Sequence, residues 1–435
     1  MPHQDVNRNA ASSATTRMLE KMLSGSIVKQ AKFRNDCLWT SRQFINAAVL
    51  WALSEHGTLT ERFHEAKRQS CRLFPDENKC GGSYQAFRKM LCTWTSPLVA
   101  ASMRWCHKTM LKHSKDDRWV VLGVDGTRLS VPYSEANERS LSAHRGARKN
   151  DAPNVWLTMM WNVSAGLPWQ WCVGPSNSSE RQHLTRLVDD LPERTLLTAD
   201  AGFAGYKCWR QIIEAGHHFL IRVGSNTRLL KDCRRAPANR VWLWPDKQAK
   251  SGEPPIELRL VVLRETKTPV YLVTSVLSSS VLPDEHVGEI YRQRWGVEVF
   301  FRDFKRTLNK HKLQSRTPEH VVTELNWSIV GLTLLMLHAK EQQRSSGESS
   351  SRSSVSRCLN IFRRAIRTWY ETFAQIAAQF RVAFTDSYQR KRKQRRRPAQ
   401  KRKKKPPGMP DFLLTPQWMK DIAAKIPPIK LSSYG

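Results

Sequence analysis

The chain has 435 residues, of which 40% are hydrophobic, so it can bury a sizeable core and is too long for one average domain. Lysine and arginine number 71 against 38 aspartate and glutamate residues, which gives a formal net charge of +33. This excess predicts a polyanionic partner, either nucleic acid or an anionic membrane, and argues against charge that serves solubility alone.

Cysteine usage and the N-terminus argue against a secreted protein. The 9 cysteines are an odd number and no two form a CxxC pair, so neither a disulfide framework nor a cysteine zinc site is expected. The N-terminal segment Met1–Ala10 is polar and has no apolar core, which predicts no signal peptide. The longest apolar run, Ile329–Leu337, falls short of the roughly 20 residues that span a bilayer, so it predicts a buried helix and no membrane partner.

Residues 1–115 are predicted to be helical. Phe44–Leu53 and Tyr84–Met103 carry apolar residues at helical spacing, with polar and basic residues between them. A helical, basic N-terminal region fits a DNA-binding domain, and a generic helical domain fits the same pattern.

The next region, 116–345, has the sequence pattern of an α/β domain. Short apolar runs alternate with amphipathic segments in the order strand, strand, strand, helix, strand, helix, strand, which predicts a mixed sheet. The expected strands are Trp119–Asp125, Val155–Val163, Trp169–Val173, Leu196–Ala199 and His218–Val223, and the expected helices are Ser179–Leu191 and Tyr206–Ala215.

Residues 224–282 are predicted to form a β-rich insertion in that domain. Its expected strands are Val241–Trp244, Leu258–Arg264 and Val270–Val276. Two long helices follow, over about Asp284–Leu308 and Pro318–Gln343.

The last region, 346–435, is expected to hold a linker, a helical segment and a basic tail. Ser345–Ser356 is rich in serine and predicts a flexible linker, and Leu359–Arg381 is amphipathic and predicted helical. Arg390–Lys405 is so densely basic that it should be disordered when free. Its interpretations are a non-specific DNA contact, a solvated tail or a nuclear import signal.

One face of the helix predicted around residue 298 is unusual. Tyr291, Arg294, Glu298 and Lys305 fall within roughly a 60° sector at 3.6 residues per turn, with Trp295 and Arg302 beside them. A carboxylate flanked by cations and aromatic rings suits phosphate binding around a metal ligand. A solvated face with an i,i+4 ion pair between Arg294 and Glu298 is the alternative.

Two aspartates follow predicted strands. Asp125 precedes Gly-Thr, and Asp200 precedes Ala-Gly-Phe. In α/β sheets ligand-binding groups gather at the carboxyl ends of strands, so these two acids and Glu298 can converge on one site. Such a set suits magnesium, which takes hard oxygen ligands. An ordinary Asp-Gly turn is the alternative for either aspartate alone.

Together these residues resemble a known family. The pattern Tyr-x2-Arg-x3-Glu-x6-Lys at Tyr291, Arg294, Glu298 and Lys305 is similar to the signature of bacterial insertion-sequence-four transposases, of the DDE group. The Asp-Gly-Thr at Asp125 and the Asp-x-Gly-Phe at about residue 200 occur in the family's order. The resemblance covers about residues 118–340, and the family also has a β-rich insertion between its second Asp and its Glu.

The resemblance implies a ribonuclease-H-like catalytic domain over 116–345, between a DNA-binding domain (1–115) and the C-terminal region (346–435). It implies that Asp125, Asp200 and Glu298 are the catalytic metal ligands for Mg²⁺, with Mn²⁺ as a substitute. The residues implied to contact DNA are Tyr291, Arg294 and Lys305, joined by Trp295 and Arg302.

The activity implied is metal-dependent DNA cleavage and strand transfer in cut-and-paste transposition. The implied partners are double-stranded DNA, at the transposon ends and the target, and a second copy in a homodimer, within the bacterial cytoplasm and its nucleoid. The alternatives are a nuclease or resolvase of the same fold, a non-enzymatic DNA-binding relative, and a two-carboxylate glycosidase, against which the positive charge counts.

Overall fold

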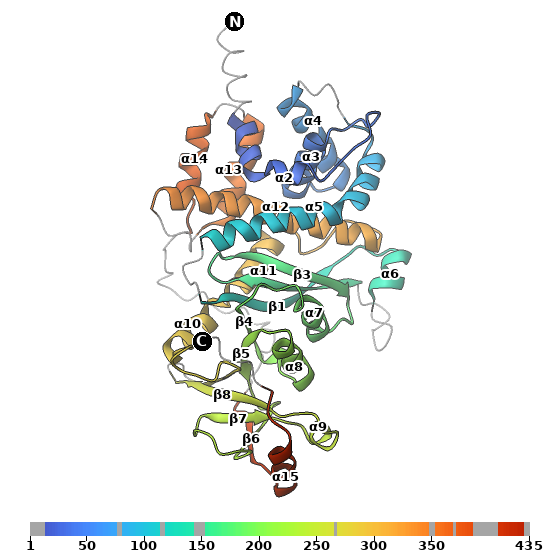
Figure 1. Ribbon diagram of the computed structural model, residues 1–435. Helices are drawn as coiled ribbons and strands as arrows, with labels where there is room; N and C mark the ends of the chain where they lie inside the picture. The colour runs from blue at the N-terminus through green and yellow to red at the C-terminus, as the bar shows by residue number, and fades with distance from the viewer. Residues whose placement is uncertain are drawn as a thin grey trace, which may run out of the picture.

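The protein is built on one large sheet with a layer of helices at one end (Figure 1). In a computed structural model, the described residues are 14–75, 81–113, 118–142, 153–264, 268–347, 353–368, 371–385 and 408–429. The sheet has ten strands in the order β10-β6-β7-β8-β9-β5-β4-β1-β2-β3. In chain order these strands are β1 (Val120–Ser130), β2 (Asn154–Asn162), β3 (Leu167–Pro175), β4 (Thr195–Ala199), β5 (His218–Val223), β6 (Arg228–Lys231), β7 (Arg240–Leu243), β8 (Ile256–Leu263), β9 (Val270–Thr274) and β10 (Asp411–Leu414).

The first five strands form the mixed core of the sheet. β1, β2 and β3 are antiparallel neighbours, whereas β4 runs parallel to β1 and β5 runs parallel to β4. Helix α7 (Glu180–Leu187) precedes β4 and helix α8 (Tyr206–Glu214) precedes β5, as the sequence predicted, although α7 ends four positions before the expected Leu191. The predicted α/β class with a mixed sheet is confirmed.

The first strand is longer than predicted. The sequence analysis ended it at Asp125, because Asp-Gly is a common turn, and that boundary was wrong. Antiparallel pairing with β2 continues from Asp125↔Met159 to Ser130↔Asn154, so the partner strand satisfies the backbone groups that a turn would have released. Asp125 therefore lies inside β1 rather than at its end.

The β-rich insertion extends the same sheet. The strands predicted in it are present as β7, β8 and β9, and β9 pairs antiparallel with β5 of the core. Two strands were missed: β6, and β10, which comes from the far end of the chain and runs parallel to β6. Two short helices accompany this part of the sheet, α9 (Asp246–Lys250) and α15 (Gln417–Lys425).

The N-terminal region is helical, as predicted. Residues 14–22 are helical, and the helices that follow are α2 (Gly25–Val28), α3 (Ser41–Leu53), α4 (Leu59–Leu73) and α5 (Tyr84–Lys112), with α6 (Glu135–Leu141) after β1. Thr40 begins α3 and Thr58 begins α4 with capping boxes, in which the hydroxyl and the Gln43 or Glu61 side chain satisfy backbone N–H groups reciprocally. These helices lie on the side of the sheet remote from the insertion (Figure 1).

The helix α12 (Pro318–Ser345) is the core of the helical layer and agrees with the predicted span 318–343. It is the one described helix that is long and apolar enough to cross a membrane, yet 83% of its apolar window is buried inside the protein. It packs against α3, α5 and α14 (Phe373–Arg381), which accounts for its apolar character as that of a core helix.

The C-terminal region departs from the prediction in one respect. The helix expected over Leu359–Arg381 is two helices, α13 (Val355–Thr368) and α14, and Thr372 begins the second with its own capping box. The expected linker at 345–356 is only partly among the described residues, and its ends belong to α12 and α13. The basic segment Arg390–Lys405 lies outside the described residues.

The helix predicted over Asp284–Leu308 is also two helices, α10 (Asp284–Gln293) and α11 (Gly296–Arg306). Arg294 and Trp295 between them keep right-handed backbone angles. Their hydrogen bonds tighten, however: Trp295 N donates to the Arg292 carbonyl, and Val297 N donates to the Arg294 carbonyl. The two helices therefore meet at a tightened turn and do not form one uniform helix.

Candidate active site

Asp125 and Asp200 are brought together by the register of two parallel strands. The pairing of β1 with β4 ends at Val124↔Ala199, and each aspartate is the next residue along the chain. Neighbouring strands lie about 4.8 Å apart, so the two residues begin side by side where the strands separate. Each aspartate accepts a backbone hydrogen bond at 2.8 Å through Oδ1, Asp125 from Gly126 N and Asp200 from Gly202 N.

Glu298 reaches the aspartates from the first turn of α11, which packs on β1 and β2. The preceding junction sits directly on β1, because a Cβ built on Gly123 would lie 3.3 Å from Cγ of Arg294. Arg294 is buried, and its guanidinium lies 3.3 Å from Oε1 of Glu298. The absence of a side chain at Gly123 thus allows the junction to come close enough to hold Glu298 beside the sheet.

The pKa of Asp125 responds to the charges of Glu298 and Asp200, so the three carboxylates lie close together. The pKa of Asp125 is raised to about 6, mainly by burial, and the nearby charges of Glu298 and Asp200 act in the same direction. The hydrogen bond from Gly126 and the charge of Arg294 act in the opposite direction on this pKa. The structure therefore groups Asp125, Asp200, Glu298 and Arg294, as the sequence analysis predicted.

Lys305 and Tyr291 lie at the edges of this group. Nζ of Lys305 donates a hydrogen bond to Oγ1 of Thr127 at 2.6 Å, and Asp125 counters the effect of burial, which lowers the pKa of Lys305. The guanidinium of Arg294 lies over the ring of Tyr291, 5.4 Å from its centroid. Lys305 and Arg294 thus present two cations beside the carboxylates.

Trp295 and Arg302 are placed differently. Trp295 is 59% exposed at the start of α11, and Arg302 is exposed and pairs with its neighbour Asp303 at 3.1 Å. The interactions described for these two side chains do not join them to the carboxylates. Any contact they make with a ligand would be at the outer surface of the site.

The sequence analysis missed Glu180, the first residue of α7. A Cβ built on Gly126 would lie 2.2 Å from its Oε1, and one built on Gly202 would lie 3.4 Å from its Oε2 and 3.0 Å from Oδ1 of Asp200. A fourth carboxylate therefore lies against the glycines that follow Asp125 and Asp200. An acid at the start of a helix is common for helix stability, so the sequence offered no signal to single it out.

The residues of this group fit a divalent cation. All the anionic groups are carboxylates, the hard oxygen donors that magnesium and manganese take. Burial is the main cause of the raised pKa of Asp125, and the negative charges of Glu298 and Asp200, which a bound cation would neutralise, add to it. The carboxylate of Glu180 occupies the space beside Gly126 that a Cβ would fill. The Nε1 of Trp156, buried and without a partner among the described residues, lies 2.9 Å from the same Cβ position.

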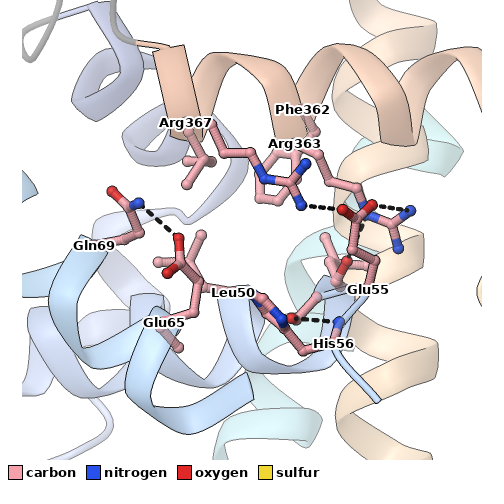
Figure 2. Close-up of a pocket in the computed structure, with 12 residues that line it drawn as sticks. Leu50, Glu55, His56, Glu65, Gln69, Phe362, Arg363 and Arg367 are labelled. Atoms are coloured by element: carbon pink, nitrogen blue, oxygen red, sulfur yellow. Dashed lines mark hydrogen bonds and ion pairs between the residues drawn. The ribbon is translucent and has the colours of Figure 1, made fainter. Parts of the chain in front are cut away.

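A separate cavity lies in the helical layer, where α3 and α4 face α13 (Figure 2). Its charged groups already pair with one another, because Glu55 accepts from Arg367 and forms an ion pair with Arg363 at 3.6 Å. Apolar side chains such as Leu50 and Phe362 complete the lining. This cavity contains none of the predicted site residues.

Another group of possible metal ligands lies between α5 and α12. Ligand atoms of Cys92, Glu319 and His320 lie within 4.8 Å of one another. Burial raises the pKa of Cys92 and lowers that of His320, and the charge of Arg88 also acts on both, so a fixed cation already lies beside this group. That charge disfavours a second cation here.

Comparisons with known proteins agree with this geometry. Residues 120–334 match the family model described as "Transposase DDE domain". The chain is 23% identical over 240 residues to the transposase InsG of insertion sequence element IS4 from Escherichia coli strain K12, covering 52% of this chain and 51% of the relative. It is 21% identical over 181 residues to a protein of insertion sequence element IS4SA from Synechocystis, covering 40% of this chain and 51% of that relative.

Residues 120–334 belong to the DDE transposase family, and the curated relatives that the chain matches are of the IS4 type. Membership of this family implies dependence on a divalent metal ion. The matched region spans about half the length of the curated relatives. A solved piggyBac transposase synaptic complex with hairpin DNA matches 86% of both chains at 9% identity, but with a TM-score of 0.42 it supports no conclusion about this chain.

Proposed function

We propose that this protein is a transposase that binds the terminal inverted repeats of an insertion sequence, cuts the DNA there and joins it to a target. The observation that supports this most directly is the meeting of Asp125, Asp200 and Glu298 at the open end of the β1–β4 pair. Lys305 and Arg294 beside them supply the positive charge that a phosphodiester needs.

The cofactor we propose is Mg²⁺, with Mn²⁺ as a substitute, held by Asp125, Asp200 and Glu298. A bound divalent ion would lower the pKa of an attacking water and stabilise the negative charge on the leaving oxygen. The aspartates approach from adjacent strands and the glutamate from α11, so ligands come from three separate elements. Rigid elements of this kind hold ligands more precisely than loops do.

In the first step, water attacks the phosphorus at the end of the element. The bond to the 3′ oxygen breaks, and a proton passes to that oxygen, leaving a 3′-hydroxyl and a 5′-phosphate. In the second step the 3′-hydroxyl attacks a phosphorus of the target strand, and a new phosphodiester replaces the one that breaks. Arg294 and Lys305 stabilise the charge on the phosphate in both steps.

Contacts with the rest of the DNA are assigned to the outer residues. Tyr291 orients the guanidinium of Arg294, while the exposed Trp295 and Arg302 contact the strand that lies over α11. The formal charge of +33 favours double-stranded DNA at both the element ends and the target. Residues 1–115 would serve as the DNA-binding domain and 116–345 as the catalytic domain.

The remaining assignments follow from the same proposal. The basic part of 346–435 would increase non-specific DNA affinity and target capture. Two element ends must be cut together, so the protein would act as a homodimer on DNA. It would do so at the nucleoid of a bacterial cytoplasm.

A cleavage assay tests the proposal. The substrate is a duplex carrying the inverted repeat that flanks the gene, incubated with Mg²⁺, with Mn²⁺ or with EDTA. Wild-type protein should nick at the edge of the repeat with either metal. EDTA and Glu298→Gln should each reduce the rate by at least about 10³-fold, given the size of effects at charge-stabilising groups.

The matched control is Glu289→Gln, because Glu289 is an exposed glutamate of the neighbouring helix α10. It should cut at the wild-type rate. A wild-type protein that binds the duplex and never cuts would replace the proposal with a non-enzymatic DNA-binding role. Cutting without joining would favour a nuclease.

A further inference from the structure

Glu180 reaches the candidate active site from the opposite face of the sheet. Gly123 and Thr127 of β1 face α11, because they contact Arg294 and Lys305, and Asp125 shares their face by strand alternation. Gly126 has the opposite orientation and contacts Glu180 of α7. The two helices therefore present carboxylates from opposite sides of the same strand.

The end of the β1–β4 pairing allows those carboxylates to meet. Because parallel pairing stops at Val124↔Ala199, β4 does not border β1 at Gly126. The chain after β4 instead turns through the short 3-10 helix η2 (Ala201–Phe203). At Gly202 a single Cβ position touches oxygens of both Asp200 and Glu180. Acids from both faces of the sheet thus come together where the β1–β4 pairing ends.

Neighbouring residues hold Glu180 at this end of the β1–β4 pairing. Nε of the adjacent Arg181 donates to the carbonyl of Gly202 at 2.9 Å, which fastens the start of α7 to the segment after Asp200. On the next turn, His183 bonds Thr158 of β2 through Nδ1 at 3.0 Å. These two contacts fix the start of α7 against both the sheet and η2, so the position of Glu180 is determined by packing.

A role limited to helix stability does not account for this arrangement. A first-turn acid stabilises a helix by about 0.3–1 kcal/mol, and it does so from any rotamer that stays near the helix end. Placement beside Asp200 and against the glycine that follows Asp125 adds like charges that repel one another. Such a concentration of carboxylates is favourable when a cation is bound between them.

We propose that Glu180 is a fourth carboxylate ligand of the divalent metal site, binding together with Asp200 from the α7 side. This inference rests on the proposed function. Gly126 and Gly202 are then required because any side chain at Gly126 would displace the carboxylate, and one at Gly202 would crowd it together with Asp200.

Manganese binding to the purified full-length protein, without DNA, tests the inference by titration calorimetry. Glu180→Gln should weaken Mn²⁺ binding by about tenfold or more, the scale of loss expected when groups that support a metal site are removed. Gly126→Ala, which keeps Glu180 but displaces its carboxylate, should weaken it similarly. The combined variant should be no weaker than Glu180→Gln alone, because both changes remove the same ligand.

The control is Asp190→Asn, which removes one exposed acid just beyond the end of α7 and should leave Mn²⁺ affinity unchanged. Melting curves in EDTA provide the second measurement. If Glu180 is a metal ligand, Glu180→Gln should melt at or above the wild-type temperature in EDTA, because repulsion between carboxylates is relieved. Added Mn²⁺ should then raise the melting temperature of this variant less than that of wild type. A purely structural glutamate predicts a lower melting temperature in both conditions, which would overturn the inference.

The metal site and the role of Glu180 in it can be disproved separately. If Asp125→Asn, Asp200→Asn and Glu298→Gln abolish Mn²⁺ binding while Glu180→Gln matches wild type, the fourth ligand is wrong and the proposed function remains. If none of these variants changes Mn²⁺ binding, the metal site itself is wrong, and with it the proposed function and the role of Glu180.

Discussion

Lys305 donates a hydrogen bond from Nζ to Oγ1 of Thr127, two residues beyond Asp125 on the same face of β1. The contact joins α11 to the strand that carries the first aspartate. It holds the ammonium close enough for Asp125 to influence its pKa. The position of this cation is therefore set by a threonine that has no charge of its own.

Removal of the Thr127 hydroxyl should impair cleavage without weakening DNA binding. In Thr127→Val the side chain keeps its size, but Lys305 loses its acceptor and samples other rotamers. A hydrogen bond to a charged group contributes about 1.5–3 kcal/mol, so the single-turnover rate should fall about tenfold or more. Binding of the repeat duplex, measured by fluorescence anisotropy, should change less than about twofold. Thr127→Ser keeps the hydroxyl and should cut like wild type; equal loss in both variants would contradict the explanation.

A side chain at Gly123 should displace Glu298. A Cβ there would approach Cγ of Arg294 to 3.3 Å, and the backbone of Arg294 lies only slightly farther away. Gly123→Ala should therefore reduce cleavage moderately, and Gly123→Val severely, as the α10–α11 junction is pushed from the sheet. Overpacking of this kind costs about 1–3 kcal/mol, measurable by urea unfolding. Full activity of Gly123→Val would show that the close approach is not needed.

The sequence predicted which acids lie at the candidate site better than it predicted the shape of the elements that carry them. Asp125 and Asp200 each follow an apolar run, and Glu298 belongs to a spaced signature, so local patterns were sufficient to find them. The continuation of β1 past Gly126 depends on pairing with β2, and the break near Arg294 accompanies its close packing on Gly123. Such contacts between distant segments leave no local pattern.

The same reasoning explains two other omissions. The pairing of β10 with β6 joins segments separated by most of the C-terminal half of the chain, and each strand has only four residues. Glu180 resembles an ordinary first-turn acid in sequence, and only the glycines packed against it reveal a different position. Both features depend on tertiary structure rather than on residue type.

A buried charge cluster should govern the stability of the helical layer. Glu324 of α12 lies 3.5 Å from the guanidinium of Arg62 and 3.4 Å from Nζ of Lys310, and all three side chains are nearly inaccessible. It also accepts hydrogen bonds from the backbone of Gln314 and Ser315. Glu324→Gln leaves two buried cations without a counter-charge, so the free energy of unfolding should fall by about 3–5 kcal/mol.

Urea denaturation measures this effect, and Glu135→Gln is the control. Glu135 pairs with Arg139 on the surface of α6, where a single ion pair contributes about 0.3–0.5 kcal/mol. If the two substitutions lower the free energy of unfolding equally, the buried Glu324 cluster contributes no more to stability than a surface ion pair.

His338 should make the protein sensitive to acid. It is buried in α12 against the ring of Phe380, and burial, assisted by the charge of Lys21, lowers its pKa to about 4 from 6.5. Between these two pH values the unfolded chain binds more protons than the folded one, so the free energy of unfolding rises with pH across this window. The full difference is about 3 kcal/mol, at 1.36 kcal/mol for each pKa unit.

The test compares urea unfolding at pH 4 and pH 7.5. His338→Leu should reduce the loss of stability at pH 4 by up to about 3 kcal/mol, because no proton is taken up at this position when the chain unfolds. Some acid sensitivity should remain, since burial also lowers the pKa of His218 to about 4. His64→Leu, at an exposed position of α4, should leave the wild-type pH dependence intact. If His338→Leu loses as much stability at pH 4 as wild type does, the acid sensitivity arises from other groups.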